Sequence, residues 1–91
     1  MFVTLGSPLA SPTFFAHLDP PPIGGKGQWP GSIERWVNVR AVGDKAAAVM
    51  LREKFGPRVK EVLIDNGHRA HDPELYLNSA ATGAAIAAAL E

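Results

Sequence analysis

The sequence contains no cysteine, no excess of charge of either sign and no long hydrophobic run near its start. Without cysteine, the chain forms no disulfide and offers no thiolate to a metal ion. Nine basic residues balance nine acidic ones, so net charge gives no reason to expect binding to nucleic acid or to an anionic membrane. The N-terminal apolar run is too short to cross a bilayer, and no basic residues precede it as in a signal peptide. We therefore expect a cytoplasmic protein with no membrane span and no nucleic-acid partner.

Length and composition indicate one small folded unit. A chain of 91 residues suffices for a single domain and is too short for two. Hydrophobic residues make up 46% of the chain and charged residues 20%, which are ordinary values for a globular protein. A unit of this size buries about 60–65% of its unfolded surface, so we expect a modest core.

Three short apolar runs are typical of β-strands, and helical segments alternate with them. Each run is rich in β-branched, leucine or aromatic residues and ends at a glycine or polar turn. The predicted strands are residues 2–5, 35–41 and 59–64, the predicted helices are residues 45–54 and 79–90 with a helical turn at 73–77, and a loop covers residues 8–34. Strands that alternate with helices favour parallel pairing, so the sequence predicts a single partial α/β unit over residues 1–91.

A sheet of parallel strands needs a covering layer on both of its faces. The last predicted helix is rich in alanine, and Gly83 would allow it to approach the sheet closely. Little else in the chain is available to cover the second face. We therefore expect either that a partner covers this face or that the chain is part of a larger α/β structure.

Polar residues follow each predicted strand, where parallel α/β sheets bind their ligands. Gly6 and Ser7 follow the first strand, Asp44 follows the second, and His68 and His71 follow the third. Because neighbouring strands lie about 4.8 Å apart, the turn that carries Asp44 and the turn that carries the histidines can meet. A carboxylate that accepts the Nδ1 proton of a histidine fixes its tautomer, and the Nε2 atom then acts as a general base.

Four blocks of the sequence carry a resemblance to a known family. In chain order they are FVTLGSPL, RWVNVRAVGDKAA, VLIDNG and AHDPELYL. Together they resemble the C-terminal third of an α/β-hydrolase-fold serine esterase or lipase. The resemblance implies an acyl ester hydrolase in which Asp44 is the triad acid and His71 is the triad base. It also implies that Gly6, Ser7 and His68 line the site.

The chain lacks the nucleophile that such a hydrolase needs. The family places its serine in a Gly-x-Ser-x-Gly turn, and this pentapeptide is absent from the sequence. Ser7 follows a strand, but Pro8 comes directly after it, so we interpret Ser7 as a turn residue. The resemblance therefore implies a fragment or shortened gene product whose nucleophile comes from an upstream segment or a partner chain. We expect the chain alone to have negligible esterase activity.

Other interpretations of these residues stay open. Asp44 can act only as a helix N-cap, and His68 can replace His71 as the functional histidine. The two histidines can also bind a metal ion with Asp65 or Asp72, although their spacing fits no specific zinc pattern. The residues themselves indicate no cofactor.

The alternative function is a small non-catalytic α/β interaction module. Three parallel strands with a poorly covered face make a weak free-standing sheet. Such a module would associate with a second copy of itself or complete the sheet of a partner.

Overall fold

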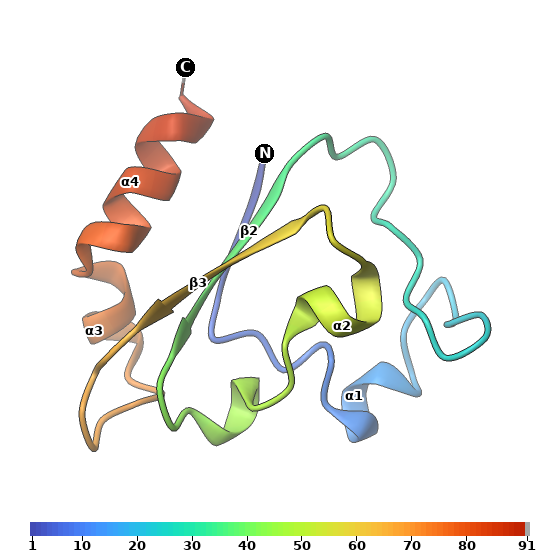
Figure 1. The fold of residues 1–91 in the computed structure, drawn as a ribbon, viewed down its shortest axis with the longest axis horizontal. Coiled ribbons are helices and arrows are strands. Elements are labelled where there is room, and N and C mark those ends of the chain that lie inside the picture. The colour runs from blue at the N-terminus through green and yellow to red at the C-terminus, as the bar shows by residue number, and fades with distance from the viewer. Residues whose placement is uncertain (91) are drawn as a thin grey trace.

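The computed structural model describes residues 1–90, which form one three-stranded sheet with short helices on both sides (Figure 1). The strands are β1 (Phe2–Leu5), β2 (Trp36–Ala41) and β3 (Val59–Ile64), and their order in the sheet follows the chain. Both pairings are parallel. The predicted α/β class with about three short parallel strands is therefore confirmed.

Short helices connect the strands and follow the last of them. In chain order they are α1 (Pro12–Phe15), the 3₁₀ turn η1 (Lys45–Ala47), α2 (Leu51–Phe55), α3 (Pro73–Leu77) and α4 (Ala80–Ala89). Three of them begin at a residue whose side chain accepts a hydrogen bond from a backbone N–H of the first turn. These residues are Asp44 for η1, Asp72 for α3 and Ser79 for α4.

The single helix predicted for residues 45–54 is wrong, because the chain leaves the helical conformation between η1 and α2. Met50 is extended there, with φ −65° and ψ 130°. Val49 just before it is β-branched, which lowers its helix propensity, and it packs against the core beside Trp36. Tertiary packing thus overrides a weak helical preference in this segment.

One face of the sheet is closed by an aromatic cluster of Phe2, Trp29, Trp36 and Phe55. The Trp36 side chain at its centre is almost fully buried. Its ring centroid lies 4.9 Å from that of Phe55 and 5.1 Å from that of Phe2, and Trp29 packs edge-on at 5.9 Å. Trp36 is buried and the other three rings are half-buried, and rings of this size contribute strongly to the stability of a small core.

The opposite face is covered by α3 and α4, against the expectation that the chain leaves it bare (Figure 1). Val39 of β2 and Tyr76 of α3 are buried together on this face. On α4, the buried residues are Thr82 and Ala85. Gly83 does not approach the sheet as expected, since no atom lies within 4 Å of the position that its Cβ would occupy. The helix turns Gly83 outward because its neighbour Thr82 faces the protein interior.

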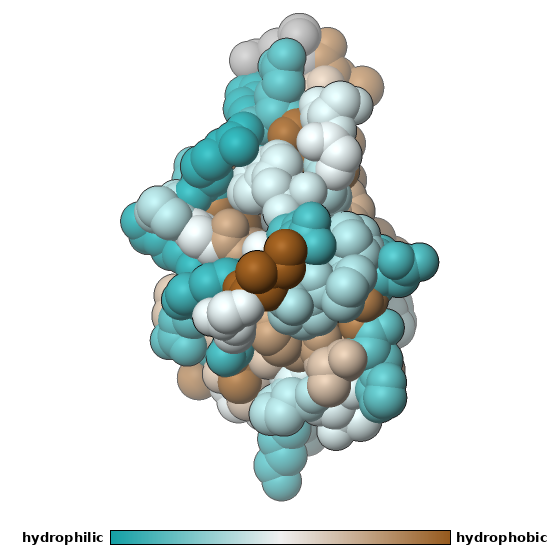
Figure 2. Space-filling model, turned by 90° about the vertical axis from the view of Figure 1, so that its right-hand side faces the viewer, coloured by the Kyte–Doolittle hydropathy of each residue, from teal (hydrophilic) through white to brown (hydrophobic). Residues whose placement is uncertain are grey.

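The side of the molecule formed by α1, α2 and the long connection presents mixed polarity. Figure 2 shows small apolar areas on this side, separated by hydrophilic side chains. Phe14 and Ile23 are among the exposed apolar residues of the connection. Scattered apolar side chains of this kind are normal on a protein surface and indicate no binding site. None of the helices within residues 1–90 is long and apolar enough to span a membrane.

Candidate active site

The turns after the three strands come together at the carboxyl edge of the sheet. Asp44 lies beyond β2, and the segment after β3 brings His71 back to it. The Nδ1 atom of His71 lies 2.8 Å from the Oδ2 atom of Asp44. The structure thus brings together the two residues that the sequence predicts as acid and base.

The carboxylate of Asp44 is buried and fully hydrogen-bonded. Its side chain is 0% exposed. Oδ1 accepts a hydrogen bond from the backbone N–H of Ala46 at 3.0 Å, while Oδ2 accepts one from the hydroxyl of Tyr76 at 2.5 Å and also faces His71. Asp44 is therefore both the N-cap of η1 and the partner of the histidine, so the two interpretations of this residue are compatible.

The surroundings of Asp44 keep it ionised. Burial acts to raise the pKa of Asp44, but the hydrogen bonds of Tyr76 and His71 outweigh it and hold this pKa below its usual value. An ionised carboxylate can accept a hydrogen bond from an Nδ1 atom that carries a proton. In a neutral imidazole at this position, the geometry therefore favours the tautomer whose Nδ1 carries the proton and whose Nε2 is free to act as a base.

Tyr76 is a site residue that the sequence reasoning missed. It comes from α3 and is 2% exposed. Its hydroxyl donates to Asp44 Oδ2 and accepts from the backbone N–H of Ala41 at 2.8 Å, which ties α3 to the end of β2. Burial, together with the hydrogen bond to Asp44, raises the pKa of Tyr76 to about 12, so the hydroxyl keeps its proton.

One signal in the sequence points to Tyr76. It is the only tyrosine of the chain, and it comes four residues after Asp72, which caps α3. Residues four apart on a helix share a face. Tyr76 therefore lies on the face of α3 that is next to the turn with His71. Its large ring carries a polar hydroxyl at its end, so it can reach the sheet and form a hydrogen bond there.

Gly6 makes close packing around the carboxylate possible. Its φ is +58°, and a Cβ at this position would lie 2.7 Å from Asp44 Oδ2 and 2.8 Å from the Tyr76 hydroxyl. Any larger residue would displace one of these groups. The predicted lining residue Gly6 therefore touches the acid and its tyrosine partner directly. Ser7 beside it is buried and accepts a hydrogen bond from the backbone N–H of Leu9 at 3.3 Å, which is a turn contact.

The imidazole of His71 is open to solvent on the side away from Asp44. Its side chain is 60% exposed, and its ring lies edge-on to that of Tyr76 with centroids 6.5 Å apart. Two shallow hollows adjoin it. One, of about 210 Å³, is lined by Leu5, His71, Pro73, Tyr76 and Leu77, and the other, of about 370 Å³, is lined by Gly43, Asp44, Lys45, Ala46, His68, Ala70 and His71. A substrate that reaches Nε2 has room on both sides of the ring.

His68 lines the second hollow, but His71 is the histidine that pairs with the carboxylate. The two aspartates considered as metal ligands serve local structure instead. Asp65 accepts a hydrogen bond from the backbone N–H of Gly67, and Asp72 pairs with Arg69 and caps α3. Within residues 1–90, no three histidine or carboxylate side chains gather as a metal site would require.

No family model, curated protein or solved structure matches the chain. The likeness to α/β-hydrolases therefore rests on the four sequence blocks, and what the site can do is argued from its geometry.

Proposed function

We propose that Asp44 and His71 are the acid and the base of a serine hydrolase that acts on carboxylic esters. The observation that carries the proposal is the contact of 2.8 Å between Asp44 Oδ2 and His71 Nδ1, combined with the exposure of the imidazole. A buried, ionised carboxylate behind an open imidazole is the arrangement that a triad needs. The nucleophilic serine is supplied by an upstream segment or by a partner chain.

The chemistry assigned to the two residues follows from their placement. His71 Nε2 takes the proton of the serine hydroxyl as its oxygen attacks the ester carbonyl, and Asp44 stabilises the imidazolium that forms. The imidazolium then protonates the leaving alkoxide as the tetrahedral intermediate collapses to the acyl-enzyme. A water molecule enters next, gives its proton to Nε2 and releases the carboxylic acid as the serine recovers its proton. Tyr76 positions the carboxylate and exchanges no proton in these steps.

The first experiment measures the reactivity of each histidine toward diethyl pyrocarbonate, which acylates a neutral imidazole nitrogen. Mass spectrometry follows His17, His68 and His71 in the same sample, and the first two serve as internal references. We expect His71 to react several-fold faster than the other two, because Asp44 accepts the Nδ1 proton and so leaves Nε2 as the proton-free nitrogen on the exposed side of the ring.

Two variants make this experiment decisive. Asp44→Asn removes the negative charge and should bring His71 to the rate of His68. Asp72→Asn changes the carboxylate that is adjacent to His71 in the chain but paired with Arg69, and it should leave the rate unchanged. Equal reactivity of all three histidines, or no effect of Asp44→Asn in a protein with an unchanged circular dichroism spectrum, would contradict the proposal.

The second experiment assays hydrolysis of p-nitrophenyl butyrate by the 91-residue chain and by His71→Ala. We expect both to remain at background, because the nucleophile is missing. If the parent chain is active and His71→Ala is not, then the base is correctly assigned but the serine lies within this chain. Ser7→Ala is then the next variant to measure.

A non-catalytic interaction module is the second candidate, and the open sheet favours it. Within residues 1–90, β1 and β3 are edge strands with no neighbour on their outer sides. Unpaired strand edges are templates for a further strand. Sedimentation velocity over a range of concentrations tests this candidate, since a monomer that melts cooperatively at every concentration would argue against it.

A further inference from the structure

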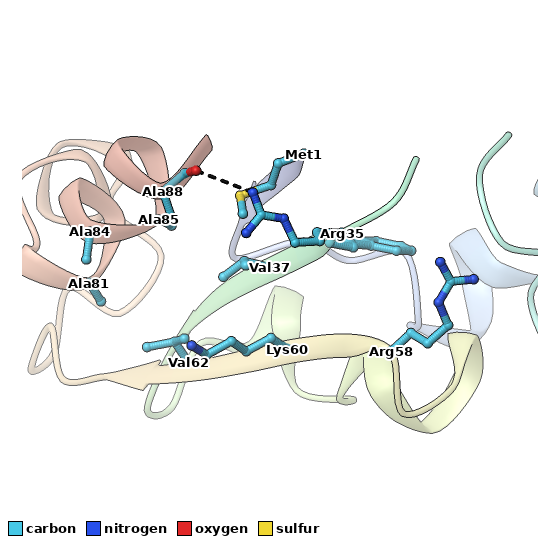
Figure 3. Close-up of a pocket in the computed structure, with 11 residues that line it drawn as sticks. Met1, Arg35, Val37, Arg58, Lys60, Val62, Ala81, Ala84, Ala85 and Ala88 are labelled. Atoms are coloured by element: carbon cyan, nitrogen blue, oxygen red, sulfur yellow. Dashed lines mark hydrogen bonds between the residues drawn. The ribbon is translucent and has the colours of Figure 1, made fainter. Parts of the chain in front are cut away.

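A cleft of about 450 Å³ opens between α4 and the amino-terminal part of the sheet (Figure 3). It lies toward the opposite end of the sheet from Asp44 and His71, because its lining includes Met1 before β1, Trp36 at the start of β2 and Lys60 near the start of β3. Its lining residues are Met1, Arg35, Trp36, Val37, Arg58, Lys60, Val62, Ala81, Ala84, Ala85 and Ala88.

The cleft exists because the residues of α4 that line it are all alanines. Ala81, Ala84, Ala85 and Ala88 form one wall, and Val37 and Val62 of the sheet lie opposite (Figure 3). A methyl group is too short to reach across to the strands, so the space between helix and sheet stays unfilled. The result is a hollow with apolar walls and a volume within the usual ligand range of about 300–1,000 Å³.

The charged residues of the cleft are all cationic. Arg35, Arg58 and Lys60 line it, and among residues 1–90 no carboxylate does. Arg35 donates to the backbone oxygen of Ala88 at 3.4 Å, and Arg58 stacks on the Trp29 ring at 4.1 Å. The ion pairs recorded among residues 1–90 are Arg69–Asp72 and His71–Asp44, so none of the three cations has a carboxylate partner there. Arg35 and Lys60 thus place two positive charges beside the apolar space, whereas Arg58 is held on Trp29 of the aromatic cluster.

We propose that this cleft binds an apolar monoanion, an aliphatic carboxylate of medium length. The aliphatic part lies between the alanine wall of α4 and the two valines of the sheet, where it displaces water from apolar surface. The carboxylate meets Lys60 and Arg35, whose charged groups flank the cleft (Figure 3). The proposal does not depend on the ester hydrolase function, because it uses none of the residues of the Asp44 site.

The test is a calorimetric titration of the 91-residue chain with octanoate, compared with octanol and butyrate. Octanol keeps the apolar part without the charge, and butyrate keeps the charge with a shorter chain. We expect octanoate to bind with one-to-one stoichiometry and about tenfold more tightly than either comparator, since both parts of the ligand contribute. No binding of octanoate, or equal binding of octanol, would overturn the proposal.

Three variants locate the binding. Lys60→Gln removes one cation and should weaken octanoate binding about tenfold. Ala84→Leu fills the hollow with a good helix former and should abolish binding. Lys45→Gln removes an exposed lysine at the other end of the sheet and should leave binding unchanged. Should Ala84→Leu fail to fold, Lys60→Gln still decides the matter, because unchanged affinity in this variant would refute the assigned site.

A second copy of the chain is the rival occupant of the cleft. If sedimentation shows a dimer that Ala84→Leu dissociates and that octanoate leaves intact, the cleft is a protein interface and the proposal fails. If octanoate binds a chain that remains monomeric, the proposal is supported.

Discussion

The two faces of the sheet are closed by opposite means. On one face, the aromatic cluster of Phe2, Trp29, Trp36 and Phe55 fills the space beneath α2 with large rings. On the other, α3 supplies the buried Tyr76, and α4 supplies small side chains that leave a cleft. The aromatic face is packed with large apolar rings, while the α3 and α4 face holds the buried carboxylate, its histidine and the cleft.

This difference shows how a small chain can support a polar site. A buried carboxylate costs free energy unless its oxygens are hydrogen-bonded, and Asp44 satisfies this requirement with groups from three separate segments. Those segments must be held in place by apolar packing elsewhere. Hence substitutions on the aromatic face should act on the whole fold, and substitutions near Asp44 should act first on the site.

The largest effect is expected for Trp36→Ala, which removes the centre of the aromatic cluster. A buried tryptophan replaced by alanine typically costs about 3–5 kcal/mol, which is a large part of the roughly 5–15 kcal/mol by which folded domains are stable. We expect this variant to melt at a much lower temperature than the parent by circular dichroism. The control is Phe14→Ala, whose side chain is 55% exposed and which should melt almost as the parent does. A cooperative melt close to the parent's would show that the aromatic cluster contributes little to stability.

The second-largest loss of stability is expected for Gly6→Ala, next to the carboxylate of Asp44. The left-handed conformation costs a non-glycine residue about 1–2 kcal/mol, and the added methyl must also displace Asp44 or Tyr76, so we expect a loss on the order of 3 kcal/mol in urea unfolding. Gly24→Ala is a matched control, because its φ of +59° is nearly the same as the +58° of Gly6 and nothing lies within 4 Å of the new Cβ. Equal losses for the two variants would mean that backbone strain, and not the crowding at Asp44, explains the cost.

The sequence predicted the parts of this site that depend on strand order. Because Asp44 and the two histidines follow adjacent parallel strands, topology predicted that their turns could meet, whereas the choice of His71 over His68 came from the family resemblance. Tyr76 escaped prediction because the spacing from Asp72 gives its helix face, but not how α3 packs against the end of β2. The break at Val49 and the outward position of Gly83 escaped for the same reason, since each is set by contacts between segments that are distant in the chain.

In an alkaline titration, Tyr76 should ionise at a higher pH than a solvent-exposed tyrosine does. Its pKa is about 12 in the folded protein and 10.0 is the ordinary value, so its contribution to stability is complete below pH 10 and is lost as the pH rises toward 12. Because the chain has one tyrosine, tyrosinate absorbance reports this residue alone. We expect a midpoint well above the one measured in urea.

The control for this titration is Tyr76→Phe, which should show no tyrosinate signal. Between pH 10 and 12, its free energy of unfolding should fall less than that of the parent chain. The deleted hydroxyl leaves the Ala41 N–H and one oxygen of Asp44 short of a partner, which should cost about 1–3 kcal/mol at neutral pH. A folded-state midpoint near pH 10 would mean that the hydroxyl is not held against Asp44 in solution.

The smallest effect, and the only stabilising one, is expected for Gly83→Ala in α4. Alanine is favoured over glycine inside a helix by about 0.5–1 kcal/mol, and no atom lies within 4 Å of the added methyl group. We expect a higher urea midpoint with an unchanged slope, and unchanged reactivity of His71. Gly27→Ala is the contrasting variant on the aromatic face, because its Cβ would lie 2.4 Å from the Phe55 ring and must destabilise the fold. If Gly83→Ala also destabilises, then the outward side of α4 is covered in solution, which would favour the non-catalytic interaction module.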